Sequence, residues 1–288
     1  MVSSAHLCRC SGYQQLIQGV RMAARGEVPA AVPPRIGART WREDGPDKVT
    51  GRARYTADLP LPPGTLHAAV YRTHLPHTEI LGIDLAGALE VPGVVDAFDH
   101  RAVPGEARYG NAVADQPVLA GHRSRFSGEA LAVVVATSEE AAREGCERIE
   151  VVFRELPAVT DPRKALEADA PRLHPERDEG NLLCHLKLAR GDVEAALAGA
   201  ERVVERTYST TWQEHACLET EAALAEPDGG GGLVVRCPSQ NVFFDRLHIC
   251  KALDLPRYTV RVIQQPTGAA FGGREASYAQ IHAALAAP

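Results

Sequence analysis

Gln264-Gln265-Pro266-Thr267-Gly268-Ala269-Ala270-Phe271-Gly272-Gly273-Arg274-Glu275 is the stretch on which the fold of the surrounding chain depends. The residues before it, 258–263, are rich in β-branched and aromatic side chains and predict a strand. Residues 275–287 after it place Tyr278, Ile281 and Leu285 on one face and predict a helix that begins at Glu275. A strand, a glycine loop and a helix in this order bring backbone N–H groups toward an anionic or oxo ligand.

The side chains of the loop also favour a ligand site. Gly272 and Gly273 leave room for a bulky group, Phe271 offers a flat apolar wall, and the Glu275 carboxylate can accept hydrogen bonds from a substrate. The order of glycines differs from G-x-G-x-x-G, and no Lys-Ser/Thr follows as in a P-loop. Taken alone, the loop is equally consistent with a simple glycine turn.

A second polar stretch precedes the loop by about fifty residues, Gln213-Glu214-His215-Ala216-Cys217-Leu218-Glu219-Thr220. The Gln213 amide can donate to an oxo ligand or accept from a hydroxide. The plainer alternatives are that Gln213 pairs with backbone and that Phe271 belongs to the core. Glu275 would then only offset the helix dipole, worth about 0.3–1 kcal/mol.

Two cysteines near the N-terminus form a third candidate site. They lie in Leu7-Cys8-Arg9-Cys10-Ser11-Gly12-Tyr13-Gln14, ahead of a predicted helix that runs to about residue 25. Thiolates in this position are good metal ligands, although Cys8 and Cys10 make only half of a four-thiolate site. Two free cysteines are the alternative.

Composition restricts the class of protein. The chain has 288 residues, 45% hydrophobic and 24% charged, which is ordinary for a globular protein of two domains. Its net charge of −6 gives no basic surface for nucleic acid, and no apolar run is long enough for a bilayer. The first residues lack the hydrophobic core of a signal peptide, so we expect a cytoplasmic protein. The seven cysteines are an odd number and, apart from Cys8 and Cys10, are scattered, which argues against a disulfide framework and favours small core residues for most of them.

Residues 48–160 predict a compact α+β domain. Its expected elements are strands at 65–73, 94–98, 130–136 and 149–156, a short helix at 85–89 capped by Asp84, and a helix ending near Glu147, capped by Thr137 with Glu140 three residues on. The strand at 130–136 is continuously apolar and is expected to be buried. With the helix and strand that follow, it predicts a crossover unit. His74 and His77 are expected to be surface histidines rather than metal ligands.

The remainder predicts a second domain at 191–288. Proline-containing linkers are expected before each domain, at 29–47 and at 161–190. The expected elements of the second domain are a helix at 193–198 capped by Asp192, a strand at 202–212, a hairpin of 221–225 and 233–237, and a helix at 241–253. The last of these helices is expected to turn Phe244, Leu247 and Leu253 inward.

The pair of motifs at 213–220 and 271–275 resembles the large molybdenum subunit of the xanthine dehydrogenase/aldehyde oxidase family. Residues 51–58 (Gly-Arg-Ala-Arg-Tyr-Thr-Ala-Asp) and 127–129 (Ser-Gly-Glu) resemble its a/b hammerhead domain, and residues 7–14 resemble the end of its helical [2Fe-2S] domain. The fold implied is α+β. The domains implied are a [2Fe-2S]-domain remnant at 1–28, a linker at 29–47, the hammerhead domain at 48–160, a linker at 161–190, and the first part of a molybdopterin-binding domain at 191–288.

The resemblance also implies roles for single residues. Gln213, Phe271, Gly272 and Gly273 match positions beside the molybdenum cofactor, a molybdopterin of the cytosine dinucleotide form, and Glu275 matches a substrate-binding glutamate. Cys8 and Cys10 match two [2Fe-2S] ligands, whose site is incomplete because the other two lie upstream of Met1. The family's catalytic base is a glutamate that lies beyond Pro288, so no catalytic residue is expected in this chain.

The activity implied is hydroxylation of an electron-poor carbon of a purine, another heterocycle or an aldehyde, with oxygen from water. A flavin subunit and a chain that supplies the rest of the molybdenum domain are the expected partners. We expect the chain to be a fragment truncated at both ends and inactive alone. The alternative is a non-catalytic module that binds the chain carrying the remaining molybdenum site. A small iron–sulfur carrier built on Cys8 and Cys10 is a third, weaker reading.

Overall fold

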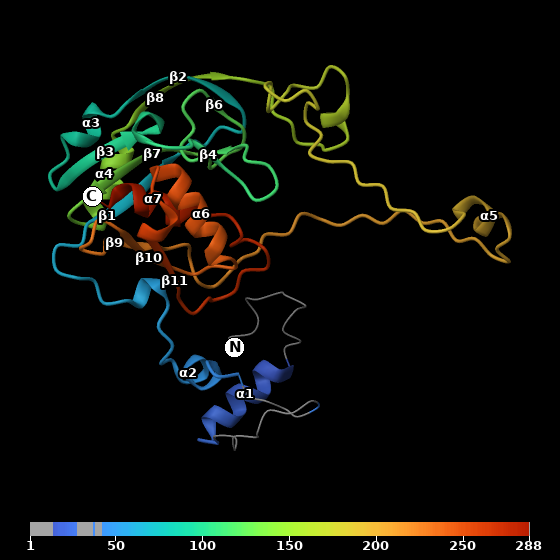
Figure 1. Ribbon diagram of the computed structural model, residues 1–288, viewed down its shortest axis with the longest axis horizontal. Coiled ribbons are helices and arrows are strands. Elements are labelled where there is room, and N and C mark those ends of the chain that lie inside the picture. The colour runs from blue at the N-terminus through green and yellow to red at the C-terminus, as the bar shows by residue number, and fades with distance from the viewer. Residues whose placement is uncertain (1–13, 28–36, 38–41, 288) are drawn as a thin grey trace. The chain divides into compact units, whose positions relative to one another are not determined.

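The computed structural model describes residues 14–27, 37 and 42–287, so the predicted ligands Cys8 and Cys10 lie outside the described residues. The chain divides into two compact units, whose elements are labelled in Figure 1. The first unit takes in residues up to Pro63 together with 215–251 and 255–288. The second unit takes in 64–214 and 252–254. Each unit is described by itself below.

The second unit contains a three-stranded antiparallel sheet in the order β1-β7-β3. Its strands are β1 (His67–Arg72), β7 (Ala130–Ala136) and β3 (Val94–Asp99). Every residue of the central strand β7 is buried, as its continuous apolar run predicts. β7 pairs with β1 on one side and with β3 on the other.

Another sheet of the same unit has the order β6-β2-β8, and a two-stranded ribbon joins β4 to β5. The bounds are β2 (Thr78–Asp84), β6 (Arg123–Ser124), β8 (Glu150–Glu155), β4 (Arg108–Tyr109) and β5 (Gln116–Pro117). The predicted crossover unit is therefore wrong, because β7 and β8 belong to different sheets. The helix between them connects two sheets instead of two parallel strands.

That helix, α4 (Glu139–Glu147), packs against β1 and β7. Its N-cap is Ser138, whose hydroxyl accepts from the Ala141 N–H at 3.1 Å, so the predicted cap at Thr137 is wrong by one residue. Thr137 instead donates its hydroxyl to the Gly93 carbonyl at 3.3 Å. The short helix α3 (Ala86–Leu89) begins where the Asp84 carboxylate accepts from the Ala86 N–H.

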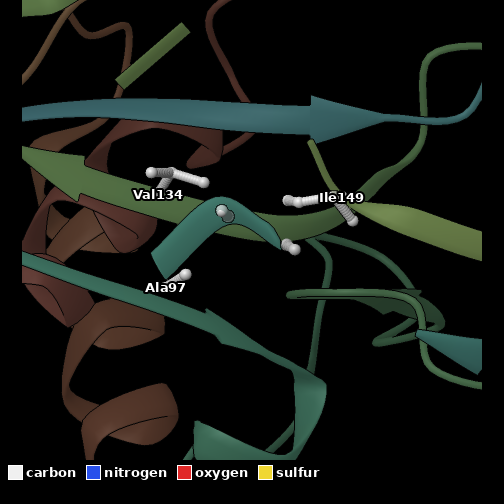
Figure 2. Packing of buried hydrophobic residues seen from close by; sticks show 5 residues of the cluster. Ala97, Val134 and Ile149 are labelled. Carbon is white, nitrogen blue, oxygen red and sulfur yellow. The ribbon is translucent and has the colours of Figure 1, made fainter. Parts of the chain in front are cut away.

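A small apolar core lies in this unit. Figure 2 shows its five buried residues, Ala88, Ala97, Ala132, Val134 and Ile149. They come from α3, β3, β7 and the residue just before β8, so the core joins elements that are distant in sequence.

The C-terminal part of this unit is mostly irregular. Helix α5 (Val193–Ala198) is capped as predicted by Asp192, which accepts from the Ala195 N–H at 2.9 Å. The strand predicted at 202–212 is wrong, because these residues, all of which are described, lie outside any sheet and are exposed. An alternating pattern alone does not make a strand when no neighbouring strand accepts its hydrogen bonds.

The first unit contains the sheet β11-β10-β9. β9 (Leu224–Pro227) and β10 (Leu233–Cys237) form the predicted hairpin, with β9 shifted toward the turn, and β11 (Val260–Gln264) pairs parallel to β10. Helix α6 (Val242–Leu253) connects β10 to β11, and α7 (Tyr278–Ala286) packs against β9 and β10.

The remaining helices of the described residues are α1 (Gln14–Ala24) and α2 (Gly45–Thr50). Short 3₁₀ turns occur in both units, at Thr56–Asp58, His100–Ala102, Lys164–Leu166 and Arg257–Thr259.

The buried face of α6 differs from the prediction. Phe244 is 37% exposed, so the prediction is wrong for this residue, whereas Leu247 and Leu253 are half-buried. The fully buried side chains include Asp245, His248 and Ile249. The helix buries this face because Asp245 and His248 form hydrogen bonds with Ser239 and Ser277, described below. The start of α7 is also later than predicted, at Tyr278, so Glu275 belongs to the loop and not to the helix.

Two further findings concern a membrane span and the histidines at positions 74 and 77. Within the described residues no helix combines the length and apolar character needed to cross a membrane. His74 is exposed as predicted, but His77 is 2% exposed and its Nδ1 lies 2.8 Å from the Pro157 carbonyl oxygen. The prediction of a surface position is therefore wrong for His77.

Candidate functional site

The glycine loop joins β11 to α7 and packs against the polar stretch that begins at His215. The Gly268 N–H donates to the Glu219 carboxylate at 2.7 Å, and the Glu219 N–H donates to the Gly268 carbonyl at 3.4 Å. The Cys217 thiol lies 3.6 Å from the Ala270 carbonyl oxygen. Residues 215–220 of the first motif and the glycine loop, about fifty residues apart in sequence, thus lie in contact within one unit.

The loop turns through an unusual backbone conformation. Ala269 has φ of 83° and Phe271 has φ of 51°, in the left-handed region that non-glycine residues avoid. Gly272 continues the turn with φ of 89°, and the Gly273 N–H closes it on the Ala270 carbonyl at 2.8 Å. Each left-handed non-glycine residue costs of order 1–3 kcal/mol, so surrounding contacts must hold the turn in place.

The glycines have different surroundings. A Cβ at Gly268 would lie 2.6 Å from the Glu219 Cβ, and one at Gly273 would lie 3.1 Å from the His215 ring. A Cβ at Gly272 would meet no atom within 4 Å. The loop is therefore filled on the side of Gly268 and Gly273 and open at Gly272, beside the 46% exposed Phe271 side chain.

Arg274 ties the loop together from inside. Its side chain is 1% exposed, and its Nε donates to the Ala269 carbonyl at 2.9 Å. Its Nη2 donates to the Glu219 carbonyl oxygen at 2.5 Å and lies 3.6 Å from that residue's carboxylate. Its Nη1 lies 3.3 Å from the Glu221 carboxylate.

A second buried network holds the approach to α7. The Ser277 hydroxyl donates to Asp245 at 2.7 Å and lies 2.9 Å from the His248 Nδ1. The Ser239 hydroxyl donates to the other Asp245 oxygen at 2.5 Å. The loop between Arg274 and α7 is thereby fixed to the buried face of α6.

Burial raises the pKa of two carboxylates near the loop, Asp245 and Glu221. Burial raises the pKa of Asp245, against the lowering effect of its hydrogen bonds from Ser239 and Ser277 and of His248. Burial also raises the pKa of Glu221, against the attraction of Arg274. Glu221 remains 41% exposed, so Arg274 has one carboxylate partner at the surface and one, Glu219, that is 7% exposed.

The predicted site residues divide between the two units. Phe271, Gly272, Gly273 and Glu275 lie together in the loop, and Glu275 is exposed. Gln213 stands two residues before His215 but belongs to the second unit, where it is exposed and its amide donates to the Thr211 hydroxyl at 2.8 Å. Cys8 and Cys10 lie outside the described residues. Within the described part of the chain, no three His, Cys, Asp or Glu side chains gather as metal ligands.

Several residues of the site were missed at the level of sequence. Glu219 and Arg274 lie within the quoted motifs but carry no obvious chemical role there. Asp245 and His248 were missed because the apolar pattern of 241–253 favoured Phe244, Leu247 and Leu253 as the buried side chains. Ser277, before α7, was missed because its contact with α6 is not visible in the sequence. A charged residue directly after two glycines, as in Gly272-Gly273-Arg274, is a signal that could have indicated a buried charge that satisfies loop carbonyls.

Comparison with known proteins gives two family matches. Residues 50–157 match the a/b hammerhead domain of aldehyde oxidase and xanthine dehydrogenase, and residues 173–288 match the molybdopterin cofactor-binding domain. The fold is therefore α+β, a hammerhead domain followed by sequence of a molybdopterin-binding domain.

Individual relatives agree with these matches. The chain is 37% identical over 246 residues to a probable xanthine dehydrogenase subunit from Bacillus subtilis, and 35% identical over 250 residues to the nicotinate dehydrogenase large molybdopterin subunit of Eubacterium barkeri. These alignments cover 85% and 87% of this chain, and 32% and 58% of the relatives. The aldehyde oxidoreductase structure from Desulfovibrio gigas aligns with a TM-score of 0.80 at 28% identity, over 98% of this chain and 34% of that one. The chain thus spans about a third to three fifths of the length of these relatives.

Proposed function

The chain belongs to the xanthine dehydrogenase/aldehyde oxidase family of molybdenum hydroxylases, and from this premise we propose that its glycine loop forms one wall of a molybdenum-cofactor site. The activity we propose is the hydroxylation of an electron-poor carbon of a nitrogen heterocycle or an aldehyde, with oxygen from water. Because the chain spans 32% of the Bacillus subtilis relative, we assign this activity to the complete assembly to which the chain contributes. The observation that carries the proposal is the loop that opens at Gly272 beside Phe271.

The residues present fit a large planar cofactor. The space at Gly272 is open for a ligand, while His215 and Glu219 fill the other side of the loop. Phe271, Gly272 and Gly273 would hold a molybdopterin, for which we propose the cytosine dinucleotide form. For Gln213, which belongs to the other unit, the proposed cofactor-binding role rests on its place in the motif 213–220. When bound, this cofactor supplies a metal centre that accepts two electrons from the substrate. For Cys8 and Cys10 we propose two ligands of a [2Fe-2S] cluster, which requires two more thiolates.

The side chains of the loop have distinct tasks in this proposal. Phe271 exposes an apolar ring that excludes water from one side of the site. The Gln213 amide can donate and accept at the same time, so it can orient an oxygen ligand. Glu275 presents an exposed carboxylate five positions after Ala270, where it can accept a hydrogen bond from a ring N–H of the substrate.

Glu275 favours nitrogen heterocycles over aldehydes as substrates. A purine presents ring N–H donors to a carboxylate, whereas an aldehyde presents only a carbonyl acceptor. The relatives include proteins named for xanthine, nicotinate and aldehyde, so the family itself leaves this choice open. We propose a purine or a related heterocycle.

The test begins with the metal content of the chain purified with any co-purifying partner from a host that makes molybdopterin. We expect near-stoichiometric molybdenum in the wild type and its loss in Gly272→Val, which fills the open side of the loop. Gly229→Val is the matched control, because Gly229 also has positive φ and open space but lies in the β9–β10 turn. Absence of molybdenum from every wild-type preparation, or equal loss in both variants, would overturn the proposed site.

Turnover of hypoxanthine, nicotinate and benzaldehyde with an artificial acceptor then tests the substrate class. We expect Glu275→Gln to reduce turnover of hypoxanthine, which has ring N–H donors, while turnover of nicotinate and benzaldehyde, which have none, changes little. Equal losses for all three substrates would argue against a hydrogen bond from Glu275 to a ring N–H.

A second candidate function is a partner-binding module, and the segment 183–214 favours it. Its large apolar side chains are highly exposed, among them Leu186 at 88%, Leu188 at 100%, Tyr208 at 87% and Trp212 at 90%. Apolar surface of this extent is typical of a protein contact. Molybdenum that appears only in a complex with a second chain, and never in this chain alone, would favour this function.

A further inference from the structure

We propose that Arg274 is a positioning residue, held by Glu219, that locks the turn 269–273 in the conformation that exposes Phe271 and Glu275. The proposal rests on the proposed function only in giving Phe271 and Glu275 their roles at the site. The lock itself is a property of the first unit and can be measured without cofactor or substrate.

The first observation is where the guanidinium donates. Its Nε donates to the carbonyl of Ala269, the residue with φ of 83°. Its Nη2 donates to the carbonyl of Glu219 in the neighbouring stretch. One planar group therefore joins the start of the turn to the segment that supports it, from a position just after the turn. A single side chain satisfies both carbonyls, which are otherwise far apart in sequence.

The second observation is that Glu219 forms a hydrogen bond with the residue just before the turn, Gly268. Its carboxylate accepts from the Gly268 N–H at 2.7 Å and lies 3.6 Å from the Arg274 Nη2. Gly268 has no room for a side chain, because a Cβ there would lie 2.6 Å from the Glu219 Cβ. Hydrogen bonds thus hold the loop at residue 268 and at residue 274. The left-handed residues Ala269 and Phe271 lie between these two positions.

Breaking the ion pair between Arg274 and Glu219 costs much free energy because both side chains are buried. Arg274 and Glu219 are 1% and 7% exposed. Removal of the Arg274 charge leaves the Glu219 carboxylate buried without its ion-pair partner, and removal of the Glu219 charge leaves Arg274 with Glu221 alone. The fork geometry of arginine is also needed. A lysine ammonium has no second nitrogen on a rigid plane and cannot reproduce the separate donations from Nε and Nη2.

A buried ion pair that only stabilises the unit would give a different experimental result. Its loss would raise hydrogen exchange throughout the sheet and its helices, because all of them would open in the same global transition. Loss of a positioning residue raises exchange mainly in the loop. Hydrogen–deuterium exchange of the full chain, resolved to the peptide 265–277 and to strands β9 and β10, separates the two cases.

We expect Arg274→Met to raise exchange of the peptide 265–277 by about tenfold or more, with much smaller changes in β9 and β10. Arg274→Lys is expected to fall between the wild type and Arg274→Met. Arg236→Met is the matched control, since Arg236 forms an ion pair with Glu226 between β10 and β9 of the same unit. This variant should leave exchange of the loop unchanged.

If Arg274→Met fails to fold, Arg274→Lys and Glu219→Gln carry the test. Glu219→Gln keeps an acceptor for the Gly268 N–H but removes the charge that faces Arg274. Unchanged loop exchange in both variants, or an equal rise in the loop and in the strands, would overturn the positioning role. These outcomes do not depend on molybdenum, so they are distinguishable from failure of the proposed function, which shows as absence of the metal from the wild type.

Discussion

Asp245 and Asp228 are carboxylates of the same unit in opposite surroundings. Asp245 is buried at 1% exposure between Ser239, Ser277 and His248. Asp228 is at the surface of the β9–β10 turn, where it accepts from the Gly230 and Gly232 N–H groups at 2.8 and 2.7 Å. Burial raises the pKa of Asp245, and the two backbone hydrogen bonds lower the pKa of Asp228. The two residues should therefore affect stability with opposite dependence on pH.

We expect Asp245→Asn to gain stability relative to the wild type as the pH rises from 3 to 7. A pKa raised by folding means that the contribution of Asp245 is complete below its ordinary value of 3.8 and is lost as the pH rises through the folded-state value. The variant cannot ionise and keeps groups that can bond Ser239 and Ser277. The measurement is the free energy of unfolding in urea at several pH values, followed by circular dichroism.

Asp228→Asn is the control, with the opposite slope. The lowered pKa of Asp228 means that its contribution to stability is present above pH 3.8 and is lost as the pH falls through the folded-state pKa. Asp228→Asn should therefore become less stable relative to the wild type as the pH rises. Parallel slopes for the two variants would contradict the assignment of Asp245 as a buried, charge-disfavouring site. Glu221, Cys237 and His248 interact electrostatically with Asp245, and they are unchanged in both variants.

Single residues also show what the sequence could reveal. Phe271, Gly272, Gly273 and Glu275 were identified because their order is unusual, and the structure brings them into one loop. The roles of Glu219 and Arg274 depend on a contact between segments about fifty residues apart, and no local pattern encodes that contact. A left-handed Phe271 was equally beyond prediction, because propensity alone disfavours it.

At the scale of elements, the contact of α4 with β7 depends on a missing side chain. Gly145 lies in α4, where a Cβ would meet the Val134 Cγ1 at 2.7 Å and the Val94 Cγ2 at 3.2 Å. Both Val134 and Gly145 are buried. Glycine is tolerated in this helix because it allows α4 to approach the sheet closely.

We expect Gly145→Ala to destabilise the chain by about 1 kcal/mol. The gain in helix propensity of about 0.5–1 kcal/mol is smaller than the cost of overpacking, about 1–3 kcal/mol. Val134→Ala alone should cost about 2 kcal/mol, and the double variant should cost about 1 kcal/mol less than the sum because the new methyl group fills the space. Denaturation in urea of the three variants gives the cycle.

Gly19→Ala in α1 controls for propensity, since a Cβ there meets no atom within 4 Å. It should leave stability unchanged or raise it. If the changes in the free energy of unfolding of Gly145→Ala and Val134→Ala are strictly additive, the two positions have no steric contact.

Elements were predictable where local signals and burial agree. β7 was predicted from its apolar run, and the cap of α5 from Asp192. The face of α6 was not, because the aromatic Phe244 suggested burial while a buried polar network selects Asp245 and His248. The segment 202–212 alternates like a strand, but a strand needs a partner to accept its hydrogen bonds, and the alternation does not supply one.

At the scale of the whole molecule, the exposed segment 183–214 is the feature that most clearly calls for a partner. It consists of irregular chain apart from the six-residue helix α5, and it carries the exposed Tyr208 and Trp212. Two such side chains in water forgo the burial that usually stabilises large aromatics. The match of residues 173–288 to a molybdopterin-binding domain includes this segment, so the segment lies in the same matched region as the glycine loop.

We expect limited trypsin digestion to cut first after Lys187, Arg190, Arg202 or Arg206, which all lie in this segment and are exposed. Proteases need an extended stretch of chain free of secondary structure, so exposure of a side chain alone is not sufficient. Arg143 and Arg148, at 71% and 63% exposure in or next to α4, are the internal controls and should resist cleavage. Mass spectrometry of the early fragments identifies the sites.

Binding of the partner that we propose should slow cleavage in 183–214 and leave the slow sites of α4 unchanged, because the partner would cover only the segment 183–214. First cuts at Arg143 or Arg148, or cleavage of 183–214 at the same rate in a purified complex, would contradict a partner seated on this segment.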